Sequence, residues 1–542
     1  MDFSVRAPSA HVDTFAHDNL PPREQWPELI FALPELNYPD RLNCVHEILD
    51  RTCNELDSVR SKLALRTYAE SWTYDHLQQT VNRLCRVLVE ECGMVPGNRV
   101  LLRGTNTPMM AACFLAVIKA GGIAVPTMPL LRAKELSVIC EKAEITHALC
   151  AYSLREELEQ TQQQSPTLRH VFYFSGGDDA LESRMRDKSP QFTAVDTSAE
   201  DVCLISFTSG TTGKPKGTMH FHRDVMAICD CFPRSTLKSE MRDVFIGTPP
   251  LAFTFGLGGL LLFPLRVGAT AVLLEKLTPE SLLKAISDFN ATICFTAPTF
   301  YRQMAPLVSQ FDLHDLRKTV SAGEALPVST REAWKRATGL TMIDGIGATE
   351  MLHIFISAAD EHVRSGATGK PIPGYQACIL NDAGQMLGAG QIGRLAVKGP
   401  TGCRYLADDR QQKYVVNGWN LTGDAYQMDE DGYFWYCART DDMIISAGYN
   451  IAGPEVEDAI LLHPAVAECA VVGLPDDERG QIVKAFIVLR PAFDADDALI
   501  KEIQDFVKKS IAPYKYPRAI EFKTSLPRTE TGKLQRFKLR LS

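Results

Sequence analysis

Residues 207–217 of the chain read Phe-Thr-Ser-Gly-Thr-Thr-Gly-Lys-Pro-Lys-Gly, and they follow an apolar stretch, Val202–Ile205. The glycines allow a ligand to approach the backbone closely, the hydroxyls can donate hydrogen bonds, and the lysines add positive charge. These properties predict a strand followed by a loop that binds a polyphosphate. The loop is not a Walker A motif, because Pro215 stands where that motif has Ser or Thr after Gly-Lys. A flexible surface loop is the alternative interpretation.

Strand-like and helix-like segments alternate on both sides of this loop. Arg99–Arg103 has the character of a strand, and Thr107, followed by proline, predicts the N-cap of a helix. A glycine pair at 121–122 ends that helix, and the next strand begins at Ile123. Similar strand-like runs occupy residues 146–151, 269–274 and 292–296. The alternation predicts an α/β architecture with largely parallel sheets.

The two ends of the chain differ in composition from its middle. Residues 1–45 are rich in Pro, Asp and Asn and are expected to form an arm over a larger body. Residues 369–424 contain more glycines and turns, which predicts a smaller β-rich subdomain. Beyond Asp441 we expect helices at 455–462 and 497–509, and strands at 469–472 and 485–489. The sequence thus predicts an N-terminal domain over residues 1–440 and a C-terminal α+β domain over residues 441–542.

The overall composition is that of a folded protein of at least two domains, since 542 residues exceed one ordinary core. A net charge of −9 argues against nucleic acid as the main partner. No secretory signal is visible in Met1–Asp18, which lacks an apolar core, and we expect no membrane span because the apolar runs are interrupted. Its 15 cysteines include no CxxC pair. We therefore expect a cytoplasmic protein with free thiols and no membrane partner.

Four further motifs follow the loop along the chain. They are Gly-Ile-Gly-Ala-Thr-Glu at 345–350, Leu-Thr-Gly-Asp at 421–424, Arg-Thr-Asp-Asp-Met-Ile at 439–444 and Pro-Arg-Thr-Glu-Thr-Gly-Lys at 527–533. Together with residues 207–217 they resemble the motifs of the adenylate-forming superfamily. That superfamily includes acyl- and aryl-CoA synthetases, peptide-synthetase adenylation domains and firefly luciferase. The resemblance implies a large N-terminal domain of α/β subdomains plus a β-rich subdomain, followed by a small, mobile C-terminal α+β domain.

The resemblance also implies a nucleotide site. Glu350 would help to hold Mg²⁺, which prefers carboxylate and phosphate oxygens, and Thr349 would donate its hydroxyl to the α-phosphate. Asp424 would accept both ribose hydroxyls, with Arg439 as a second contact. Outside this context a lone Glu is usually solvated, and an Asp after Thr-Gly usually forms a turn. The implied ATP and AMP contacts are Thr208, Ser209, Gly210, Thr211, Thr212, Gly213, Lys214, Lys216, Gly323, Glu324, Asp344, Gly345, Ile346, Gly347, Asp424 and Arg439.

Lys533 is the implied catalytic residue of adenylation, alongside Thr349 and Glu350. Attack of a carboxylate on the α-phosphate builds up negative charge while pyrophosphate leaves, and a positioned ammonium stabilises that transition state. Its place between Gly532 and Leu534 near the chain end would otherwise indicate a solvated lysine. Acetylation of Lys533 would remove its charge and is a conceivable route of regulation.

The second half-reaction needs a moving part, because Lys533 must first approach the phosphates and then leave room for a thiol. In the resembled family the small domain rotates about a hinge aspartate, which Asp441 matches. The segment that contains Gly448 and Tyr449 would then line the tunnel for the pantetheine arm of CoA. Gly448 would leave room for that arm.

Departures from the general pattern indicate one branch of the superfamily. Ile346 stands where relatives often have an aromatic ring beside adenine, and Phe253 stands where many carry His. Together with residues 321–326 and 349–355, these positions resemble the benzoate–CoA ligase branch. Two more stretches, 19–27 and 398–405, resemble 2-aminobenzoate (anthranilate)–CoA ligases within that branch.

The pocket for the acid is expected to be a flat apolar slot. Its candidate lining residues are Phe253, Phe255, Ala322, Ile346 and Gly347. His353 is the candidate acceptor for an ortho amino group, with a hydrogen-bonded core histidine as the alternative. Phe253 and Phe255 alternate like neighbours in a strand, so one of them could serve core packing alone. The favoured acids are 2-aminobenzoate and benzoate, while salicylate and other small aryl acids stay open.

The expected reaction is the ATP-dependent ligation of a small aromatic carboxylic acid to CoA, with Mg²⁺ as cofactor. An acyl-carrier protein is an alternative thiol partner, and a non-catalytic nucleotide-binding protein is an alternative of another class. The intact Lys533, Glu350 and Asp424 speak against the non-catalytic alternative. The oligomeric state stays open, with a homodimer as one option. His220 and His222 are expected at the start of the helix after the loop rather than at a metal site.

Overall fold

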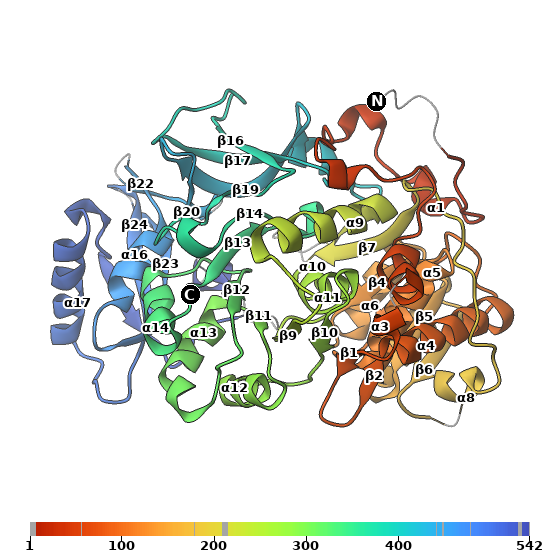
Figure 1. The fold of residues 1–542 in the computed structure, drawn as a ribbon. Helices are drawn as coiled ribbons and strands as arrows, with labels where there is room; N and C mark the ends of the chain where they lie inside the picture. Colours follow the sequence, from red (N-terminus) through yellow and green to blue (C-terminus); the bar gives the residue numbers. More distant parts are fainter. Residues whose placement is uncertain are drawn as a thin grey trace.

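The computed structural model describes residues 7–55, 57–177, 179–208, 215–440, 442–446, 449–476, 478–528 and 534–540. Within these residues lie two large sheets, a five-stranded sheet and a C-terminal α+β part (Figure 1). Several residues predicted for the site lie outside the described residues: Ser209, Gly210, Thr211, Thr212, Gly213, Lys214, Asp441, Gly448 and Lys533.

A six-stranded sheet with the strand order β6-β5-β3-β4-β7-β8 contains the strand that precedes the predicted loop. All neighbours are parallel except β7 and β8, which are antiparallel. Its strands are β3 (Arg99–Arg103), β4 (Ile123–Thr127), β5 (His147–Ala151), β6 (His170–Phe174), β7 (Val202–Thr208) and β8 (Lys216–Phe221). The helices of this part are α4 (Tyr74–Arg86), α5 (Pro108–Lys119), α6 (Ala133–Lys142), α7 (Arg155–Gln164), α8 (Leu181–Met185) and α9 (His222–Asp230).

A nine-stranded sheet has the order β15-β14-β13-β12-β11-β9-β10-β1-β2. Its six central strands are parallel. At one edge β2 is antiparallel to β1, and at the other β14 is antiparallel to β13 and β15 is antiparallel to β14. Its strands are β1 (Leu63–Arg66), β2 (Ser71–Thr73), β9 (Val244–Gly247), β10 (Thr270–Val272), β11 (Ile293–Thr296), β12 (Lys318–Ser321), β13 (Ile343–Gly347), β14 (Ile354–Ala358) and β15 (Lys370–Pro371). Its longer helices are α12 (Pro279–Asp288), α13 (Pro298–Met304) and α14 (Val328–Thr338).

The two large sheets share one hydrophobic core. Leu65 of β1, Val100 of β3 and Phe295 of β11 belong to the same cluster of buried side chains. All 12 residues of α5 are buried, so this helix is enclosed by protein on every side. The Thr107 side chain accepts a hydrogen bond from the Met110 N–H at the start of α5, which confirms the predicted N-cap.

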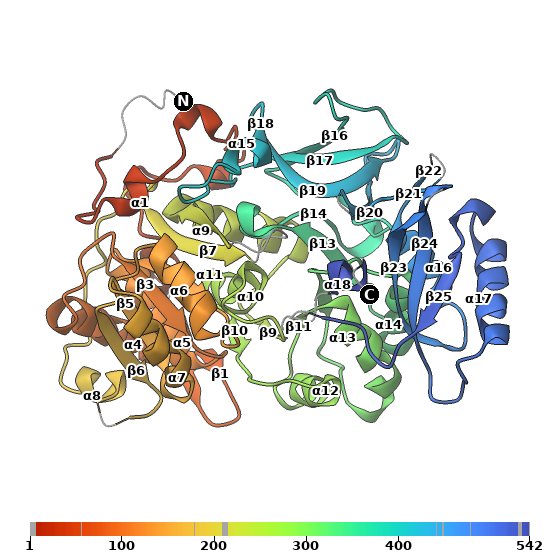
Figure 2. The ribbon, with the colours of Figure 1, turned by 180° about the vertical axis from the view of Figure 1, so that it is seen from behind.

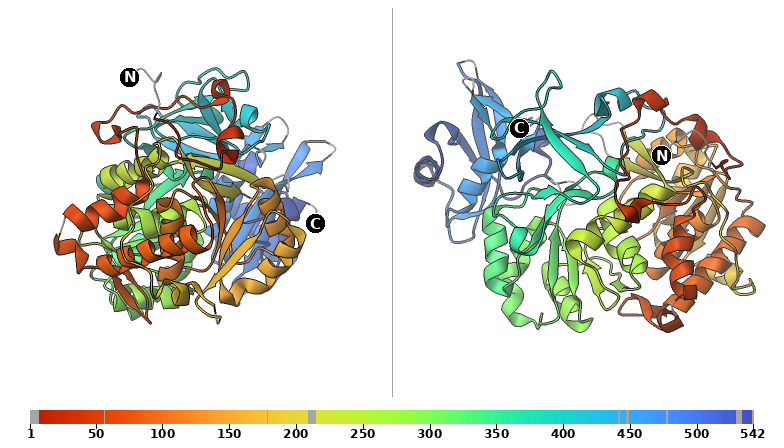
Figure 3. Two further views of the ribbon diagram at one scale, coloured as in Figure 1. Left: turned by 90° about the vertical axis from the view of Figure 1, so that its right-hand side faces the viewer. Right: turned by 45° about the horizontal axis from the view of Figure 1, so that its top comes forward.

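A five-stranded antiparallel sheet lies above the two large sheets in Figure 1. Its strands are β16 (Gln376–Leu380), β17 (Ile392–Lys398), β18 (Val415–Val416), β19 (Trp419–Met428) and β20 (Phe434–Arg439), with the short helix α15 (Gln411–Tyr414) before β18. Figure 3 shows this sheet between the N-terminal segment and the C-terminal part. A β-rich subdomain is therefore present where one was expected, but its sheet begins at Gln376 and continues to Arg439, because Lys370–Pro371 pairs within the nine-stranded sheet.

The C-terminal α+β part lies at the end of the molecule opposite the six-stranded sheet (Figures 1 and 2). Its core forms where α16 and α17 pack on the strands through Val456, Ile487 and Ile503. Its elements are β21 (Ile444–Ser446), β22 (Tyr449–Ile451), α16 (Gly453–Leu461), β23 (Val466–Asp476), β24 (Gly480–Leu489), α17 (Asp497–Ser510), β25 (Ala519–Phe522) and α18 (Arg536–Arg540). The predicted helices and strands of this region are all present.

The remaining elements are short. They are α1 (Phe15–Asp18), α2 (Arg51–Glu55), α3 (Asp57–Arg60), α10 (Thr254–Leu257), α11 (Phe263–Arg266) and the single turns η1 (Arg23–Gln25), η2 (Pro34–Leu36), η3 (His46–Asp50), η4 (Val87–Glu91), η5 (Tyr152–Leu154), η6 (Pro233–Leu237), η7 (Gly258–Leu262), η8 (Ala305–Gln310), η9 (Thr349–Met351), η10 (Asp360–His362) and η11 (Pro513–Lys515). The N-terminal arm crosses the body and pairs Leu29 with Gly399 and Arg41 with Ser198. No helix in the described part of the chain has the length and apolarity that a membrane crossing requires.

Two local predictions were wrong. Phe253 and Phe255 do not share a strand: Phe253 caps the short helix α10, and Phe255 lies inside it. A short apolar run fits a strand or a buried helix equally well, and the neighbouring Gly256 here contacts the backbone of Pro250 closely. His220 lies in β8, while His222 is the first residue of α9, as expected.

Candidate functional site

The two strands that flank the predicted phosphate loop form an antiparallel pair. β7 ends at Thr208 and β8 begins at Lys216, and these residues lie opposite each other in the register. The hydroxyl oxygen of Thr208 is buried and has no hydrogen-bond partner within the described ranges. Both ends of the predicted loop therefore meet at one place, beside a polar group that is available to a ligand.

Lys216, Tyr405 and Glu350 form a chain of three polar side chains at this place. Lys216 Nζ donates a hydrogen bond to the Tyr405 hydroxyl at 2.9 Å, and that hydroxyl donates to Glu350 Oε1. Lys216 Nζ lies 3.6 Å from the same Glu350 oxygen. Glu350 and Thr349 belong to η9, which follows β13, so the structure joins two distant predicted motifs.

The second carboxylate oxygen of Glu350 fits the predicted Mg²⁺ site. Among the described residues, Oε2 has no hydrogen-bond partner, whereas Oε1 is held by Tyr405. Glu350 is largely buried, with 8% of its surface exposed. A carboxylate oxygen that has no partner in the described part of the chain, beside a phosphate loop, suits a hard cation that also binds phosphate oxygens.

The predicted ribose contacts lie side by side on neighbouring strands. Asp424 of β19 and Arg439 of β20 face each other in the register, and Arg439 Nη1 donates to Asp424 Oδ1 at 3.0 Å. Burial raises the pKa of the Asp424 carboxyl, and the positive charge of Arg439 opposes that shift. Gly423 has a φ of +78°, and a Cβ there would lie 2.7 Å from Arg439 Nη2. The glycine of the Thr-Gly-Asp motif thus makes room for the guanidinium.

The other predicted nucleotide contacts lie at the carboxyl ends of parallel strands. Gly323 and Glu324 follow β12, and the segment 344–347 lies in β13. This edge is where α/β sheets usually bind ligands. Burial raises the pKa of Asp344 to about 6, although Arg331 Nη2 lies 4.0 Å from its carboxylate. Ile346 is half-buried and presents an apolar side chain there.

The C-terminal part contacts this same edge. Arg528 Nη1 lies 3.5 Å from Glu324 Oε1, and Arg528 Nη2 donates to Glu468 at 2.8 Å. Arg528 also forms an antiparallel bridge with Leu534. The two described residues on either side of 529–533 are therefore paired with each other, and one of them, Arg528, contacts Glu324. Tyr449, predicted for the CoA tunnel, is 54% exposed and stacks on Tyr514 with a centroid distance of 4.6 Å.

Of the residues predicted for the acid pocket, Phe255 and His353 lie side by side. Three aromatic rings surround the His353 imidazole, with centroid distances of 4.5 Å to Phe263, 5.7 Å to Phe232 and 5.8 Å to Phe255. Burial lowers the pKa of His353 to about 3, so the imidazole is neutral. Neither ring nitrogen has a well-formed hydrogen bond within the described residues, although an interaction with the Phe255 backbone opposes the fall in the pKa of His353. Both predicted roles of His353, amine acceptor and core histidine, stay predictions. Ala322, at the end of β12, is also buried.

Three residues near the site were not predicted from the sequence. Tyr405 joins Lys216 to Glu350, and Phe232 and Phe263 complete the rings around His353. The glycine-rich segment 256–259 could have indicated this close packing, because a Cβ on Gly258 would lie 2.5 Å from the His353 ring. Glycines of this kind mark positions of close approach.

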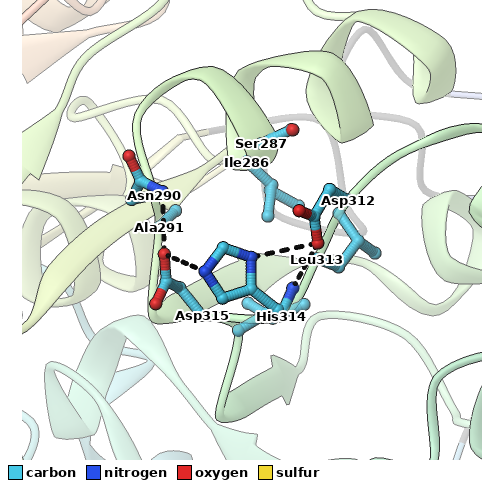
Figure 4. A pocket seen from close by; sticks show the side chains of 9 residues that line it. Ile286, Ser287, Asn290, Ala291, Asp312, Leu313, His314 and Asp315 are labelled. Atoms are coloured by element: carbon cyan, nitrogen blue, oxygen red, sulfur yellow. Dashed lines mark hydrogen bonds and ion pairs between the residues drawn. The ribbon is translucent and has the colours of Figure 1, made fainter.

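Two small surface pockets lie at opposite ends of the central strands of the nine-stranded sheet. The pocket in Figure 4 contains Asn290, Asp312, His314 and Asp315, which precede β11 and β12 and therefore lie at the amino ends of these strands. The His314 ring forms a hydrogen bond with Asp312 at 3.0 Å, and its Nε2 lies 3.2 Å from Asp315 Oδ2. The other pocket is lined by Thr299, Arg302, Glu324 and Thr330 at the carboxyl ends. Only the second pocket includes a residue predicted for the site.

Comparisons with known proteins agree with this geometry. The profile of the AMP-binding enzyme family matches residues 55–405, and that of the AMP-binding enzyme C-terminal domain matches residues 455–533. A benzoate–CoA ligase from Thauera aromatica is 36% identical over 514 residues, which cover 94% of this chain and 97% of the relative. The protein belongs to the AMP-binding enzyme family.

Two solved structures share the whole architecture. The anthranilate CoA ligase AuaEII in complex with anthranoyl-AMP superposes with a TM-score of 0.88 at 35% identity, covering 94% of this chain and 98% of that one. A benzoate CoA ligase from Burkholderia xenovorans LB400 gives a TM-score of 0.84 at 30% identity, covering 92% and 100%. The expected adenylate-forming fold, with a large N-terminal and a small C-terminal domain, is therefore confirmed. The boundary at residue 440 stays a prediction.

Proposed function

We propose that the protein is an ATP-dependent aryl acid–CoA ligase. In the first half-reaction a carboxylate oxygen attacks the α-phosphorus of ATP, the bond to the bridging oxygen breaks, and pyrophosphate leaves. In the second, the sulfur of CoA attacks the acyl carbonyl, a C–S bond forms, and AMP leaves with the oxygen that carried the acyl group. The acid is a small aromatic carboxylate, with 2-aminobenzoate or benzoate as the best candidates.

The observation that carries this proposal is the meeting of distant segments at one edge of the nine-stranded sheet. Lys216 and Glu350 join through Tyr405, the Asp424–Arg439 pair lies on the adjacent β-rich subdomain, and Arg528 of the C-terminal part reaches Glu324. Cations, buried carboxylates and the Thr208 hydroxyl, which has no partner among the described residues, together suit a magnesium–nucleotide complex.

Each polar group has a distinct role in the proposed first step. Thr208, Lys216 and the loop 209–214 hold the phosphates, Thr349 contacts the α-phosphate, and Asp424 with Arg439 binds the ribose. Mg²⁺, when bound, would neutralise phosphate charge and be held by Glu350. Lys533 stabilises the charge that develops on the α-phosphate. Asp441 serves as the hinge, and Gly448 and Tyr449 line the path of CoA once the small domain has rotated.

The neutral imidazole of His353 supports an aromatic acid with an ortho amino group. A neutral, buried imidazole nitrogen that lacks a well-formed hydrogen bond within the described residues can accept one from an amine of the substrate. The surrounding aromatic rings favour a flat substrate. The names of the relatives point the same way, because they include benzoate–CoA and anthranilate CoA ligases.

The experiment that tests this function is a panel of aryl and alkyl acids, each incubated with ATP, Mg²⁺ and CoA. We expect release of AMP with formation of the aryl-CoA mass for 2-aminobenzoate or benzoate, and much less for alkyl acids of similar size. Transfer to an acyl-carrier protein in preference to CoA would reassign the thiol partner. Nucleotide binding without AMP release for any acid would indicate a non-catalytic binder. The elution volume of the protein decides whether it is a homodimer.

A further inference from the structure

The hydroxyl of Tyr405 occupies the centre of the polar chain between Lys216 and Glu350. An ammonium can only donate hydrogen bonds and an ionised carboxylate can only accept them, so the phenol must accept from Lys216 and donate to Glu350. Its single proton is therefore committed to Glu350 Oε1.

The backbone and ring of Tyr405 are held rigidly. Tyr405 bridges Thr218 of β8, and the Leu406 N–H donates to Gly217 O at 2.8 Å. The Tyr405 N–H donates to the Gln411 side chain at 2.9 Å, and the phenol ring packs edge-on against Tyr414 at 5.7 Å. Tyr405 is fully buried, with 0% of its surface exposed, so its side chain cannot turn out into solvent without disturbing its neighbours. Its hydroxyl is a preorganised contact for Glu350.

The Tyr405 hydroxyl lies between the charges of Lys216 and Glu350 and keeps them from forming a direct hydrogen bond. Lys216 Nζ is 3.6 Å from Glu350 Oε1, longer than a direct charge-assisted hydrogen bond of about 2.7–2.9 Å. The Lys216 ammonium also lies over the Tyr405 ring, 4.9 Å from its centroid. Without the hydroxyl, Lys216 and Glu350 would be free to form a direct pair. Both would then be withdrawn from a phosphate and a metal ion.

We propose that Tyr405 is a positioning residue that holds Glu350 through Oε1 and thereby presents Oε2 to the Mg²⁺ that accompanies ATP. This inference rests on the proposed function, because it takes Glu350 as the ligand of that ion. The contacts of the Tyr405 hydroxyl are to Lys216 and Glu350, so Tyr405 acts through these two side chains. Its effect passes through the orientation of Glu350 and through the separation of Glu350 from Lys216.

The test is Tyr405→Phe with Tyr414→Phe as the matched control. Tyr414 belongs to the same ring cluster, and its buried hydroxyl has no hydrogen-bond partner among the described residues. Both variants remove one buried phenolic oxygen, but only Tyr405→Phe breaks the chain to Glu350. Melting temperatures of both variants verify that each is folded.

The readout is the affinity for Mn²⁺, a paramagnetic substitute for Mg²⁺, in the presence of a non-hydrolysable ATP analogue, followed by electron paramagnetic resonance. We expect Tyr405→Phe to weaken Mn²⁺ binding by about tenfold, since a hydrogen bond to a charged group is lost. Tyr414→Phe should match the wild type. In kinetics, Tyr405→Phe should shift the Mg²⁺ concentration for half-maximal adenylation by a similar factor while the KM for the acid stays the same.

Two results would overturn the proposal. Unchanged Mn²⁺ affinity in Tyr405→Phe would show that Glu350 needs no support, and equal losses in both variants would assign the effect to ring packing. Failure of the proposed function is a separate outcome. It would appear as a wild-type protein that forms no acyl-AMP with any acid, whatever the metal affinities of the variants are.

Discussion

Lys533 makes the sharpest prediction for a single side chain. Replacing it with alanine should lower the rate of acyl-AMP formation about a hundredfold or more, because one preorganised charge stabiliser of the transition state is lost. Formation of the thioester from supplied acyl-AMP should continue at nearly the wild-type rate. Single-turnover measurements of each half-reaction test this difference.

Lys538→Ala is the matched control for Lys533→Ala, because Lys538 is an exposed lysine of α18 in the same terminal segment. It should leave both half-reactions unchanged. Equal losses of both half-reactions in Lys533→Ala would show that this lysine has no special role in adenylation.

Because His353 is buried and neutral, we expect the free energy of unfolding to depend on pH. Burial lowers its pKa from 6.5 to about 3, so below pH 6.5 the unfolded chain binds a proton here that the folded chain does not. The stabilising contribution is therefore complete above pH 6.5 and declines as the pH falls towards 3. His353→Leu removes this titration. Between about pH 5.5 and 4.5 the free energy of unfolding of the variant should gain about 1.4 kcal/mol relative to the wild type.

Urea unfolding of wild type and His353→Leu at several pH values measures this difference. A difference between the two proteins that does not change with pH would contradict a buried neutral imidazole.

The hairpin of β19 and β20 explains why the Thr-Gly-Asp motif needs its glycine. In Gly423→Ala the new Cβ would lie 2.7 Å from Arg439 Nη2, so the guanidinium must move away from Asp424. We expect the KM for ATP to rise about three- to tenfold, in line with the loss of one charge-assisted contact to the ribose. Isothermal titration with ATP in the absence of acid tests the same effect on binding.

Gly432→Ala provides the control within the same hairpin. Gly432 has a φ of +80°, close to the +78° of Gly423, but a Cβ there meets no atom within 4 Å. Both substitutions should cost about 1 kcal/mol of stability through backbone strain, while only Gly423→Ala should weaken ATP binding. Weakened binding in both variants would mean that strain in the hairpin, and not Arg439, is responsible.

Strands and helices with strong local signals were predicted well. The N-cap at Thr107, the strand 99–103 and the alternation in the C-terminal part all follow from residues close together in the sequence. Phe253 and Phe255 were placed wrongly because a short apolar run does not distinguish a strand from a helical turn. Local pattern thus predicts elements more reliably than the direction of single side chains.

The candidate site was predicted only in part, because some of its contacts join residues that are far apart in the sequence. Motif residues such as Glu350 and Asp424 could be proposed one by one from their local sequence. Tyr405 could not, because it meets Glu350 and Lys216 across 55 and 189 positions. The rings of Phe232 and Phe263 reach His353 through the same kind of long-range packing. Such contacts depend on the tertiary fold and leave little trace in one sequence.

At the scale of the whole molecule, Arg528 links the two domains. It contacts Glu324 of the N-terminal domain and Glu468 of the C-terminal part, beside the segment that contains Lys533. We expect Arg528→Ala to slow acyl-AMP formation about two- to fivefold, which is the range of a partly exposed ion pair. The thioester step should be spared, because it requires a different arrangement of the domains.

Arg518→Ala is the control for Arg528→Ala, since the hydrogen bond of the Arg518 side chain joins it to Tyr516 within the C-terminal part. Rapid-quench rates for both half-reactions at low and high salt measure the effect, and the difference from wild type should shrink as salt screens the pair. A loss in the thioester step alone would contradict this role of Arg528.

The measurement that tests the central claim most directly is the exchange of labelled pyrophosphate into ATP in the presence of an aryl acid. Exchange requires the loop after β7, Glu350 and the C-terminal lysine to act on one nucleotide, and it needs no CoA. With 2-aminobenzoate or benzoate we predict rapid exchange by the wild-type protein and almost none by Lys533→Ala. Pyrophosphate that never enters ATP, whichever carboxylate is supplied, would contradict the account.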